Sequence, residues 1–364
     1  GGEVGVDLLA QRTTVHPLQP FSRRYFEGDA ALFTYAREWR QAHGGVAENG
    51  TGNGNGPMPF EPLTEPLGLQ QLARFLKNPV KAFFRTRLDV VFDELQTQDD
   101  DEVFALDGLD RHSLLSHLID DPQAAVDEGI EAALARRVRQ LQGSGALPMR
   151  ALGSRVAQGL EQEALPLLRS WSDLAQTYPQ AVDKRALIVE HQDLRLDDWL
   201  DGLRTGGQSP IWMQLSASRL SDGKAQARAE KLIDAWVRQL AASACGHAVQ
   251  GVLIGVDARV DLPPLPPAEA RDHLHTLLAA SQEGMRRPLP FTARTALAEL
   301  KNGKGQEAYE GGYSTSGEVE EPCLARTFPD FASLSADGRF KTYLAELFQP
   351  LFDWAAQAVV IRHG

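Results

Sequence analysis

The sequence predicts an α/β fold in which helices flank a mixed central sheet and a large helical layer adjoins it. Short apolar runs at residues 186–189, 196–201 and 211–215 are separated by Gly, Asp and Pro, which is typical of consecutive strands. An amphipathic segment at residues 225–244 follows, and a further strand is predicted at 249–256. The order strand, strand, strand, helix, strand therefore defines the expected core.

The amphipathic segment at residues 225–244 is expected to bury one helical face against the sheet. Its large apolar side chains recur at three- and four-residue intervals, as one face of a helix requires. They are Leu232, Ile233, Trp236, Val237 and Leu240. We expect Trp236 to lie between the helix and the sheet.

Residues 1–66 are expected to form an extended segment with one short helix at 30–41. A linker rich in Gly, Asn and Pro occupies residues 43–66, because such a composition opposes regular structure. Residues 67–182 are expected to form the helical layer. The core is placed at 183–300, and residues 301–364 are expected to supply a Gly-rich loop and a C-terminal helix packed on it.

Helical patterns fill most of the layer and return after the core. In the first of them, at 67–89, Asn78-Pro79 divides two helices, because Pro disfavours helix at the residue before it. An acidic run at 99–102 is expected to be a loop. The other predicted helices are 108–119, 124–141, 152–175, 267–284, 293–300 and 338–360.

Composition limits the functional classes. The 364 residues carry a formal net charge of −12, whereas a protein whose whole surface grips nucleic acid is usually basic. Any nucleic-acid contact is therefore expected to be local, with most of the surface facing protein or solvent. The two cysteines are too few for a disulfide framework or a zinc site. There is no Gly-rich phosphate loop followed by Lys, so ATP hydrolysis is not expected in this chain.

The location of the protein is an expectation from the same composition. No apolar run is long enough for a membrane span and no signal peptide is recognised, so we expect a cytoplasmic protein without membrane contact. The sequence begins at Gly1 without a methionine, and we expect it to be part of a longer protein.

The core order suits a metal-dependent nuclease, whose chemistry requires a particular set of residues. One carboxylate late on the second strand and an acidic-x-Lys triplet on the third would hold Mg²⁺ and orient the attacking water. Asp201 stands at the first position, but the triplet reads Gln214-Leu215-Ser216. A site without the second anion and the lysine is expected to hold Mg²⁺ poorly. The sequence therefore predicts a core that keeps the fold and lacks the catalysis.

An active site rebuilt from other residues is the alternative hypothesis. In that case Asp201 would act with Glu190 or Asp198 and with a migrated lysine such as Lys224. The alternative is chemically sound because geometry, rather than sequence position, makes a site.

Basic residues mark candidate DNA contacts at two places. Arg23 and Arg24 precede Tyr25-Phe26, where a ring could stack on a base. Lys77, Lys81 and Arg85 recur every four residues, so a helix would align them in a stripe that Arg87 extends. Solvated surface charge is the alternative interpretation of both. The same holds for a further cluster, Arg136, Arg137 and Arg139.

Five segments, taken in order, resemble the C-terminal part of the RecC family, the gamma chains of exodeoxyribonuclease V. The segments are HPLQPFSRRYF, LARFLKNPVKAFFRTRLDV, EVFALDGLDRHSLLSHLI, GMRRPLPFTARTALAEL and GGYSTSGEVEEPCLARTFPDF. The resemblance covers nearly the whole chain. It implies a subunit of the bacterial RecBCD helicase–nuclease, which processes double-strand ends for recombination.

The resemblance also implies a fold and a degenerate site. The fold is a PD-(D/E)XK nuclease-like core that has lost its catalytic set. Asp201 matches the first metal carboxylate, whereas Gln214 and Ser216 depart from Asp-x-Lys. The helix that follows lacks the usual Gln-x-x-x-Tyr. Asn78-Pro79 stands where some relatives have Cys-Pro for an iron–sulfur cluster, so no cluster is expected.

The implied partners are RecB-like and RecD-like helicase subunits and forked or single-stranded DNA. Mg²⁺ and ATP would belong to the partner subunits, and this chain would bind no cofactor. It would help to part the duplex, guide a strand and brace the helicases. A module that binds only protein is the remaining alternative, which the net charge favours.

Overall fold

The computed structural model describes residues 57–92, 108–148, 150–312 and 315–363, except Pro62, Thr64 and Gln208, and a few positions before residue 57. The chain divides into two units, 1–56 and 57–364. In the first unit the described residues include a short 3-10 helix, η1 (Arg23–Tyr25). The predicted helix at 30–41, apart from Leu32, and the acidic run at 99–102 lie outside the described residues. So does the predicted linker at 43–66 as far as residue 56.

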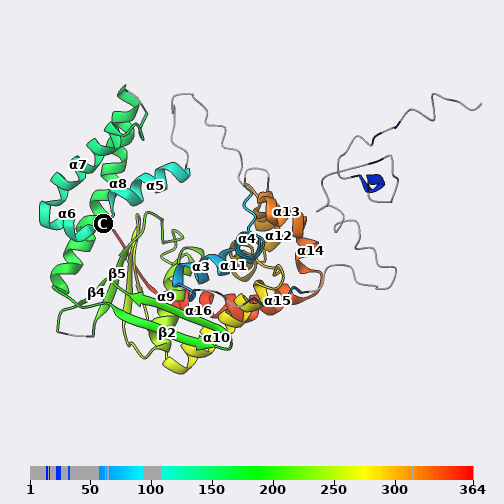
Figure 1. Cartoon of the computed structure of the whole chain (residues 1–364). Coiled ribbons are helices and arrows are strands. Elements are labelled where there is room, and N and C mark those ends of the chain that lie inside the picture. The colour runs from blue at the N-terminus through cyan, green and yellow to red at the C-terminus, as the bar shows by residue number, and fades with distance from the viewer. Residues whose placement is uncertain are drawn as a thin grey trace, which may run out of the picture. The chain divides into compact units, whose positions relative to one another are not determined.

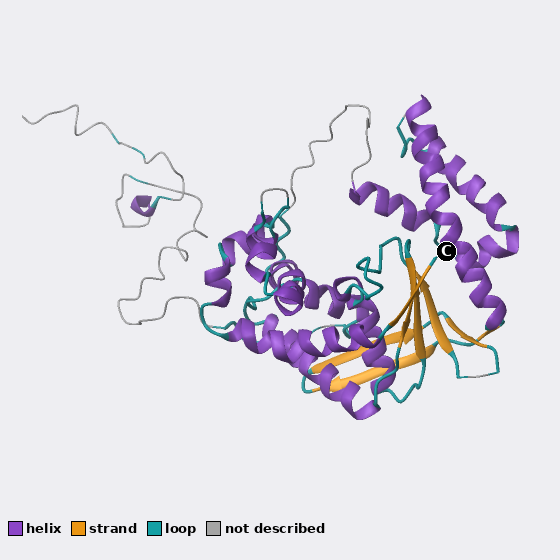
Figure 2. Cartoon of the chain, turned by 180° about the vertical axis from the view of Figure 1, so that it is seen from behind, coloured by secondary structure: helices purple, strands orange, loops and turns teal. Residues whose placement is uncertain are grey.

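Strands form a two-stranded and a six-stranded sheet, seen as two orange groups in Figure 2. The two-stranded sheet is an antiparallel hairpin in which Arg185 pairs with Leu200. The six-stranded sheet runs β1-β4-β5-β6-β7-β8, and every neighbouring pair is antiparallel except β5 and β6. The predicted mixed sheet is thus confirmed, with the hairpin as a separate sheet. The strands are β1 (Gln180–Ala181), β2 (Arg185–His191), β3 (Leu194–Leu200), β4 (Leu203–Thr205), β5 (Ile211–Leu215), β6 (Gln250–Ile254), β7 (Ala258–Leu262) and β8 (Val359–Arg362).

Helices precede and follow the sheets, as Figure 1 shows in colour order. The ones before the sheets are α3 (Leu69–Lys77), α4 (Pro79–Arg87), α5 (Gly108–Leu118), α6 (Pro122–Glu128), α7 (Ile130–Gly143) and α8 (Arg150–Thr177). Between β5 and β6 come the 3-10 helix η2 (Ala229–Lys231) and α9 (Ile233–Ala244). The later ones are α10 (Pro267–Gly284), α11 (Ala293–Asn302), α12 (Gly305–Glu310), η3 (Glu318–Glu320), α13 (Pro322–Thr327), α14 (Phe331–Ser335), α15 (Arg339–Tyr343), the π-helix η4 (Leu344–Phe348) and α16 (Gln349–Gln357).

Strand β5 lies between two helices and is buried on both faces. Ile211 and Met213 pack in one apolar cluster with Trp171 of α8. Trp212 points to the opposite face, where its indole Nε1 donates to Gln239 of α9 at 2.9 Å. Because successive strand residues alternate between faces, the apolar run that predicted β5 fills both layers.

Helix α9 closes the parallel crossover from β5 to β6 and lies at the centre of the main core. The five side chains of its predicted buried face are each at most 2% exposed. They share a cluster with the hairpin, with α3 and with the C-terminal helices. A second cluster joins α5, α6, α7 and α8. The amphipathic pattern therefore identified the helix face that organises the core.

The start of α9 is a correction to the helix predicted at 225–244. The first regular turn is η2, and α9 begins only at Ile233. Gly223 and Ala225 have φ values of +84° and +61°, which a right-handed helix cannot contain. The residues before η2 therefore form a loop.

The C-terminal helix predicted at 338–360 is a second correction. It is divided into α15, η4 and α16, and it ends at Gln357. The last apolar residues form β8, in which Val360 pairs with Val260 of β7. β8 forms backbone hydrogen bonds with β7 at the edge of the sheet. These long-range hydrogen bonds outweigh the local helical pattern.

Two further corrections concern segments that contain glycine. Gly129, with φ +97°, divides the helix predicted at 124–141 into α6 and α7. The Gly-rich loop expected at the start of 301–364 is partly helical, because α12 and η3 lie there. Throughout the described ranges, each helix is too short or too polar to cross a membrane.

Candidate functional site

The hairpin and the six-stranded sheet meet at a sharp corner formed by Asp201 and Gly202. Gly202 has φ +63°, and a Cβ there would lie 2.9 Å from the carbonyl oxygen of Met213. Met213 N donates to the Gly202 carbonyl at 3.0 Å. Only glycine accommodates both the turn and this close approach. The corner therefore places Asp201 beside the end of β5, next to Gln214.

Arg238 of α9 joins the two residues that the sequence singled out. Its guanidinium pairs with the Asp201 carboxylate and donates to the Asp201 carbonyl at 2.6 Å. It also lies 3.4 Å from Gln214 Oε1, a long hydrogen bond. A cation thus lies between the Asp201 carboxylate and the Gln214 amide oxygen.

Trp212 and Gln239 hold the guanidinium of Arg238 in place. The Arg238 side chain is 14% exposed, and its guanidinium carbon lies 4.9 Å from the Trp212 ring centroid, within cation–π range. Gln239 fixes the indole by accepting from Trp212 Nε1 and donates to the Val249 carbonyl at 2.9 Å. By contrast, the Asp201 side chain is 70% exposed. The arginine is therefore the more firmly held partner of the pair.

Ser216 lies just beyond β5 and serves the local backbone. Its N–H donates to the Ile254 carbonyl at 2.8 Å, and its hydroxyl accepts from Ser218 N at 3.3 Å. A hydroxyl used in a turn supplies no positive charge. The third position of the expected triplet thus contributes nothing that could replace a lysine.

Residues proposed for a rebuilt site have partners of their own. Glu190 pairs with Arg195 across the hairpin at 3.7 Å. Asp198 accepts from Leu69 N at 2.8 Å and so caps the first turn of α3. Lys224 lies in the loop before η2. Within the described residues, Arg238 is the cation paired with Asp201, and no three His, Cys, Asp or Glu side chains gather closely enough to hold a metal ion.

Comparison with known proteins decides the family. Residues 64–304 match the RecC C-terminal domain. The chain belongs to the RecC C-terminal domain family. It is 28% identical over 302 residues to RecBCD enzyme subunit RecC of Escherichia coli (strain K12), a match that covers 81% of this chain and 24% of that protein.

Two further relatives show the same relation of lengths. RecBCD enzyme subunit RecC of Mycolicibacterium smegmatis (strain ATCC 700084 / mc(2)155) is 28% identical over 306 residues, which is 78% of this chain and 26% of the relative. The protein of the same name from Haemophilus influenzae (strain ATCC 51907 / DSM 11121 / KW20 / Rd) is 29% identical over 199 residues. That match covers 52% of this chain and 17% of the relative. The chain spans about a quarter of the length of the relatives it matches most extensively.

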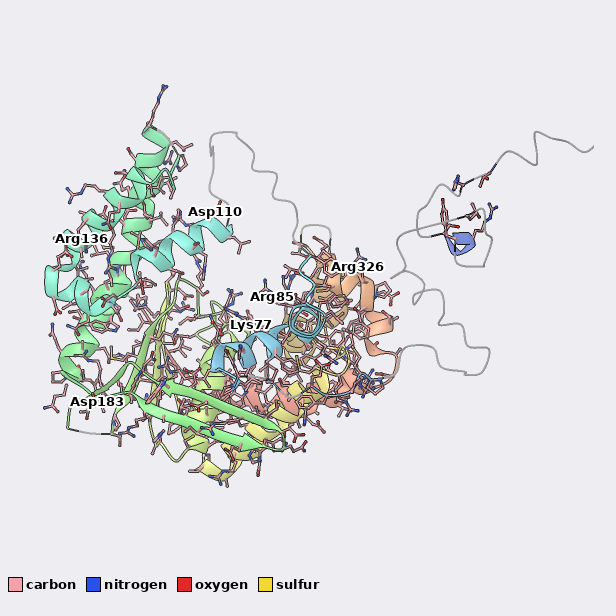
Figure 3. All side chains as sticks on the ribbon, viewed as in Figure 1. Lys77, Arg85, Asp110, Arg136, Asp183 and Arg326 are labelled. Atoms are coloured by element: carbon pink, nitrogen blue, oxygen red, sulfur yellow. The ribbon has the colours of Figure 1, made fainter. Side chains whose placement is uncertain are left out.

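The predicted basic stripe of this RecC C-terminal domain runs over two helices (Figure 3). Lys77 ends α3, whereas Lys81 and Arg85 lie on α4. Lys77 pairs with Asp234 at 2.6 Å and Lys81 with Glu321 at 2.9 Å. Arg85 is exposed and has no ion-pair partner in the described part of the chain. Half-exposed ion pairs of this kind contribute little stability, so they leave the stripe available to compete for another anion.

The remaining basic candidates differ in burial. Arg87 pairs with Glu61, and its side chain is only 12% exposed. Arg24 is exposed, and the side chain of Arg23 lies outside the described residues. Arg137 is 8% exposed and donates to the Leu118 carbonyl at 2.7 Å, so it ties α7 to α5. A surface role for Arg137 is therefore wrong.

Sequence reasoning missed Arg238 and Gln239. One signal was present, because these two long polar side chains interrupt an otherwise apolar and small-residue stretch of α9. Gln239 also stands four residues before Ser243, so the helix carries Gln-x-x-x-Ser. The pairing of Arg238 with Asp201 depends on the corner at Gly202, which no local pattern reveals.

Proposed function

We propose that this chain is the C-terminal region of a RecC subunit in a RecBCD-type enzyme of DNA repair, and that its core is a PD-(D/E)XK nuclease-like fold without catalytic activity. Family membership supports the first part. The strand order around α9 and the corner at Asp201 support the second. The proposal extends to the domain limits, with 183–300 as the nuclease-like core and 67–182 and 301–364 as its additions.

The guanidinium of Arg238 between Asp201 and Gln214 is the observation that carries the proposal. Mg²⁺ in nucleases depends on carboxylates together with substrate phosphate. Here one carboxylate is already paired, and a second cation at the same place would be repelled by the first. The chain thus supplies its own cation where a nuclease would need a metal ion.

A non-catalytic domain of this kind would guide DNA and brace RecB-like and RecD-like partner subunits. The net charge of −12 suits a surface that largely faces protein. Arg24, Lys81 and Arg85 are exposed and remain the candidates for local phosphate contacts. Cofactors are not needed by this role, so Mg²⁺ and ATP would act in the partner subunits.

Cleavage of linear DNA tests the catalytic part of the proposal. The chain and its Asp201→Ala variant would be incubated with linear duplex and single-stranded DNA in Mg²⁺ or Mn²⁺. We expect no cleavage above buffer background from either protein, with circular dichroism confirming that both are folded. Reproducible cleavage that disappears in Asp201→Ala would establish a rebuilt active site and overturn the proposal.

A purely protein-binding module is the second candidate, favoured by the net charge. Photo-cross-linking of forked DNA in the assembled complex separates the two. We expect cross-links to this domain at the unpaired strands. A complete absence of such cross-links, with cross-links to the partner subunits in the same sample, would favour the protein-binding module.

A further inference from the structure

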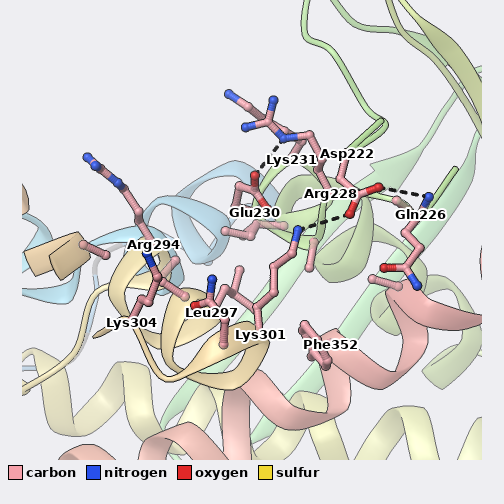
Figure 4. Close-up of a pocket in the computed structure, with 18 of the residues that line it drawn as sticks. Asp222, Gln226, Arg228, Glu230, Lys231, Arg294, Leu297, Lys301, Lys304 and Phe352 are labelled. Atoms are coloured by element: carbon pink, nitrogen blue, oxygen red, sulfur yellow. Dashed lines mark hydrogen bonds and ion pairs between the residues drawn. The ribbon is translucent and has the colours of Figure 1, made fainter. Parts of the chain in front are cut away.

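A cavity of about 920 Å³ lies beside the N-terminal end of α9, away from the corner at Asp201. Its walls come from the loop at 222–228, η2, α11, α12 and α16, together with the end of α3 (Figure 4). Cavities of several hundred Å³ are typical of ligand sites. Among the charged residues that line the cavity, Lys77 and Lys224 were singled out from the sequence, and for other roles.

The cavity is basic although the chain is acidic. Seven of its lining residues are Lys or Arg and four are Asp or Glu. Three of the four acids have a cation within the cavity: Lys301 lies 3.3 Å from Asp222, Arg228 lies 2.8 Å from Glu230, and Lys304 lies 2.8 Å from Glu307. These pairs neutralise each other.

Glu318, the fourth acid, is used inside the protein. Its carboxylate accepts from Thr295 N at 2.9 Å and from Thr295 Oγ1 at 2.7 Å, and also from the hydroxyl of Thr292. These contacts lie at the first turn of α11, where a carboxylate is stabilised by the free N–H groups. Glu318 therefore has little capacity left to neutralise a cation of the cavity.

Three cations are left without a carboxylate partner among the described residues: Lys224, Lys231 and Arg294. All three are exposed, and Arg294 donates to the Ser316 carbonyl at 3.0 Å. They line the same cavity from three places in the chain: the loop before η2, η2 itself and α11. Arranged in this way, they present positive charge to a ligand from several sides.

The floor of the cavity is apolar. Ile233, Leu297 and Phe352 line it together with several alanines. Phe352 is half-buried, so part of its ring remains accessible. An apolar floor under a cationic rim suits a ligand that carries both an uncharged flat group and negative charges. A nucleotide chain with unpaired bases has this chemistry, because its bases can stack while its phosphates meet cations.

We propose that this cavity binds a short stretch of single-stranded DNA, with phosphates at Lys224, Lys231 and Arg294 and a base on the floor beside Phe352. The choice of DNA as the anion rests on the proposed function. A duplex is disfavoured because its bases stay stacked and paired, so only its phosphates could reach the rim. The site is separate from the corner at Asp201 and requires no metal ion.

The proposal is tested by measuring how tightly the chain binds a fluorescent oligothymidine of about 12 nucleotides. Binding is monitored by fluorescence anisotropy in a buffer that contains EDTA. We expect the combined variant Lys224→Glu, Lys231→Glu and Arg294→Glu to bind at least about 10-fold more weakly at low salt. The neutral set with Gln at the same positions should give an intermediate loss. The slope of log affinity against log salt should fall by about 2, since each phosphate contact on a single strand contributes about 0.7.

A matched control makes the same charge change elsewhere on the chain. Arg150, Arg155 and Lys341 are exposed and lie outside the cavity, and the combined change of all three to Glu should alter the affinity by less than about 2-fold. Phe352→Leu keeps the floor apolar and removes the ring, so it should weaken binding by a few fold.

Three results would overturn the proposal: an unchanged affinity of the Lys224, Lys231 and Arg294 variant, equal affinity for a duplex of the same length, or equal competition by tripolyphosphate or poly-glutamate at matched charge. The last result would define a general anion or acidic-peptide site. Because EDTA excludes metal-dependent cleavage, failure of this site leaves the proposed non-catalytic core standing. Cleavage in the Mg²⁺ assay, conversely, leaves the cavity proposal standing.

Discussion

The corner at Asp201 contacts Arg238 of α9, whereas the cavity lies beside η2 and the start of the same helix. The two regions differ in how their positive charges are paired. At the corner, one guanidinium contacts a carboxylate, a carbonyl and an amide oxygen of the protein itself. At the cavity, cations outnumber acids, and three have no carboxylate partner in the described residues. A paired, held cation completes the structure, whereas surplus cations above an apolar floor favour a ligand. Under the proposed function, the domain would lack the metal site of a nuclease and would still carry the chemistry for another ligand.

Trp236→Ala should have the largest effect on both regions, because α9 positions both of them. Trp236 is 2% exposed, and its ring lies 5.1 Å from Trp354. We expect a loss of about 3–5 kcal/mol in the free energy of unfolding, measured by urea denaturation. Trp199 is 48% exposed, and Trp199→Ala is the control, with an expected loss below about 1 kcal/mol. A loss below about 1 kcal/mol for Trp236→Ala would mean that the helix face is wrongly assigned.

Gln239→Leu should cost less and should act mainly on the corner. The change leaves Trp212 Nε1 and the Val249 carbonyl buried without their partner. We expect a loss of about 1–3 kcal/mol in unfolding free energy. Gln306, which is exposed on α12, provides the control, and Gln306→Leu should change stability by at most about 0.5 kcal/mol. Equal effects of the two changes would remove the support assigned to Gln239.

Asp201→Asn should have a small effect on stability despite the ion pair with Arg238. The Asp201 side chain is 70% exposed, so water screens the pair, and the amide oxygen can still accept from the guanidinium. The expected loss by urea denaturation is below about 1 kcal/mol. A loss above about 2 kcal/mol would show that the pair, rather than the packing of Arg238 on Trp212, holds the corner together.

The smallest expected effect is on the pH dependence of stability, and it concerns His275 of α10, which belongs to neither region. Burial lowers the pKa of His275 from its usual value of 6.5; nearby His191 and Arg271 lower it further, and Asp272 raises it. Because the folded pKa lies below the unfolded one, the neutral form stabilises the fold above pH 6.5. This stability is lost as the pH falls through the lowered pKa. Thermal melts between about pH 7.5 and about pH 5.5 should show a smaller decrease in Tm for His275→Phe than for the unchanged protein. Equal decreases would remove His275 as a cause.

The sequence predicted the parts of this fold that depend on local pattern. Short apolar runs located β2, β3, β5 and β6, and the recurrence of Trp236 and Leu240 located the buried face of α9. Errors arose where the backbone takes unusual angles or pairs over long range. Ala225 has a positive φ that ordinary alanines avoid, and the residues of β8 find a partner about 100 positions away.

The sequence identified residues of the candidate site but not the contacts between them. Asp201, Gln214 and Ser216 were singled out by position along the strands, and the structure brings the first two together. Arg238 joins them only because Gly202 turns the chain toward β5 and because Trp212 supports the guanidinium. The cavity escaped notice for a similar reason, since its cations lie far apart in the sequence, from Lys77 to Lys304.

Mn²⁺ binding, measured by electron paramagnetic resonance on the unchanged chain and on Asp201→Asn, tests the central claim most directly. According to the proposed function, Arg238 occupies the place of the metal ion. The unchanged chain and Asp201→Asn should therefore both leave Mn²⁺ free in solution, to the same extent. A variant that removes the guanidinium and restores the anion, Arg238→Gln with Gln214→Glu, should bind Mn²⁺ more tightly than either. Tight binding of Mn²⁺ by the unchanged chain, abolished in Asp201→Asn, would contradict the account.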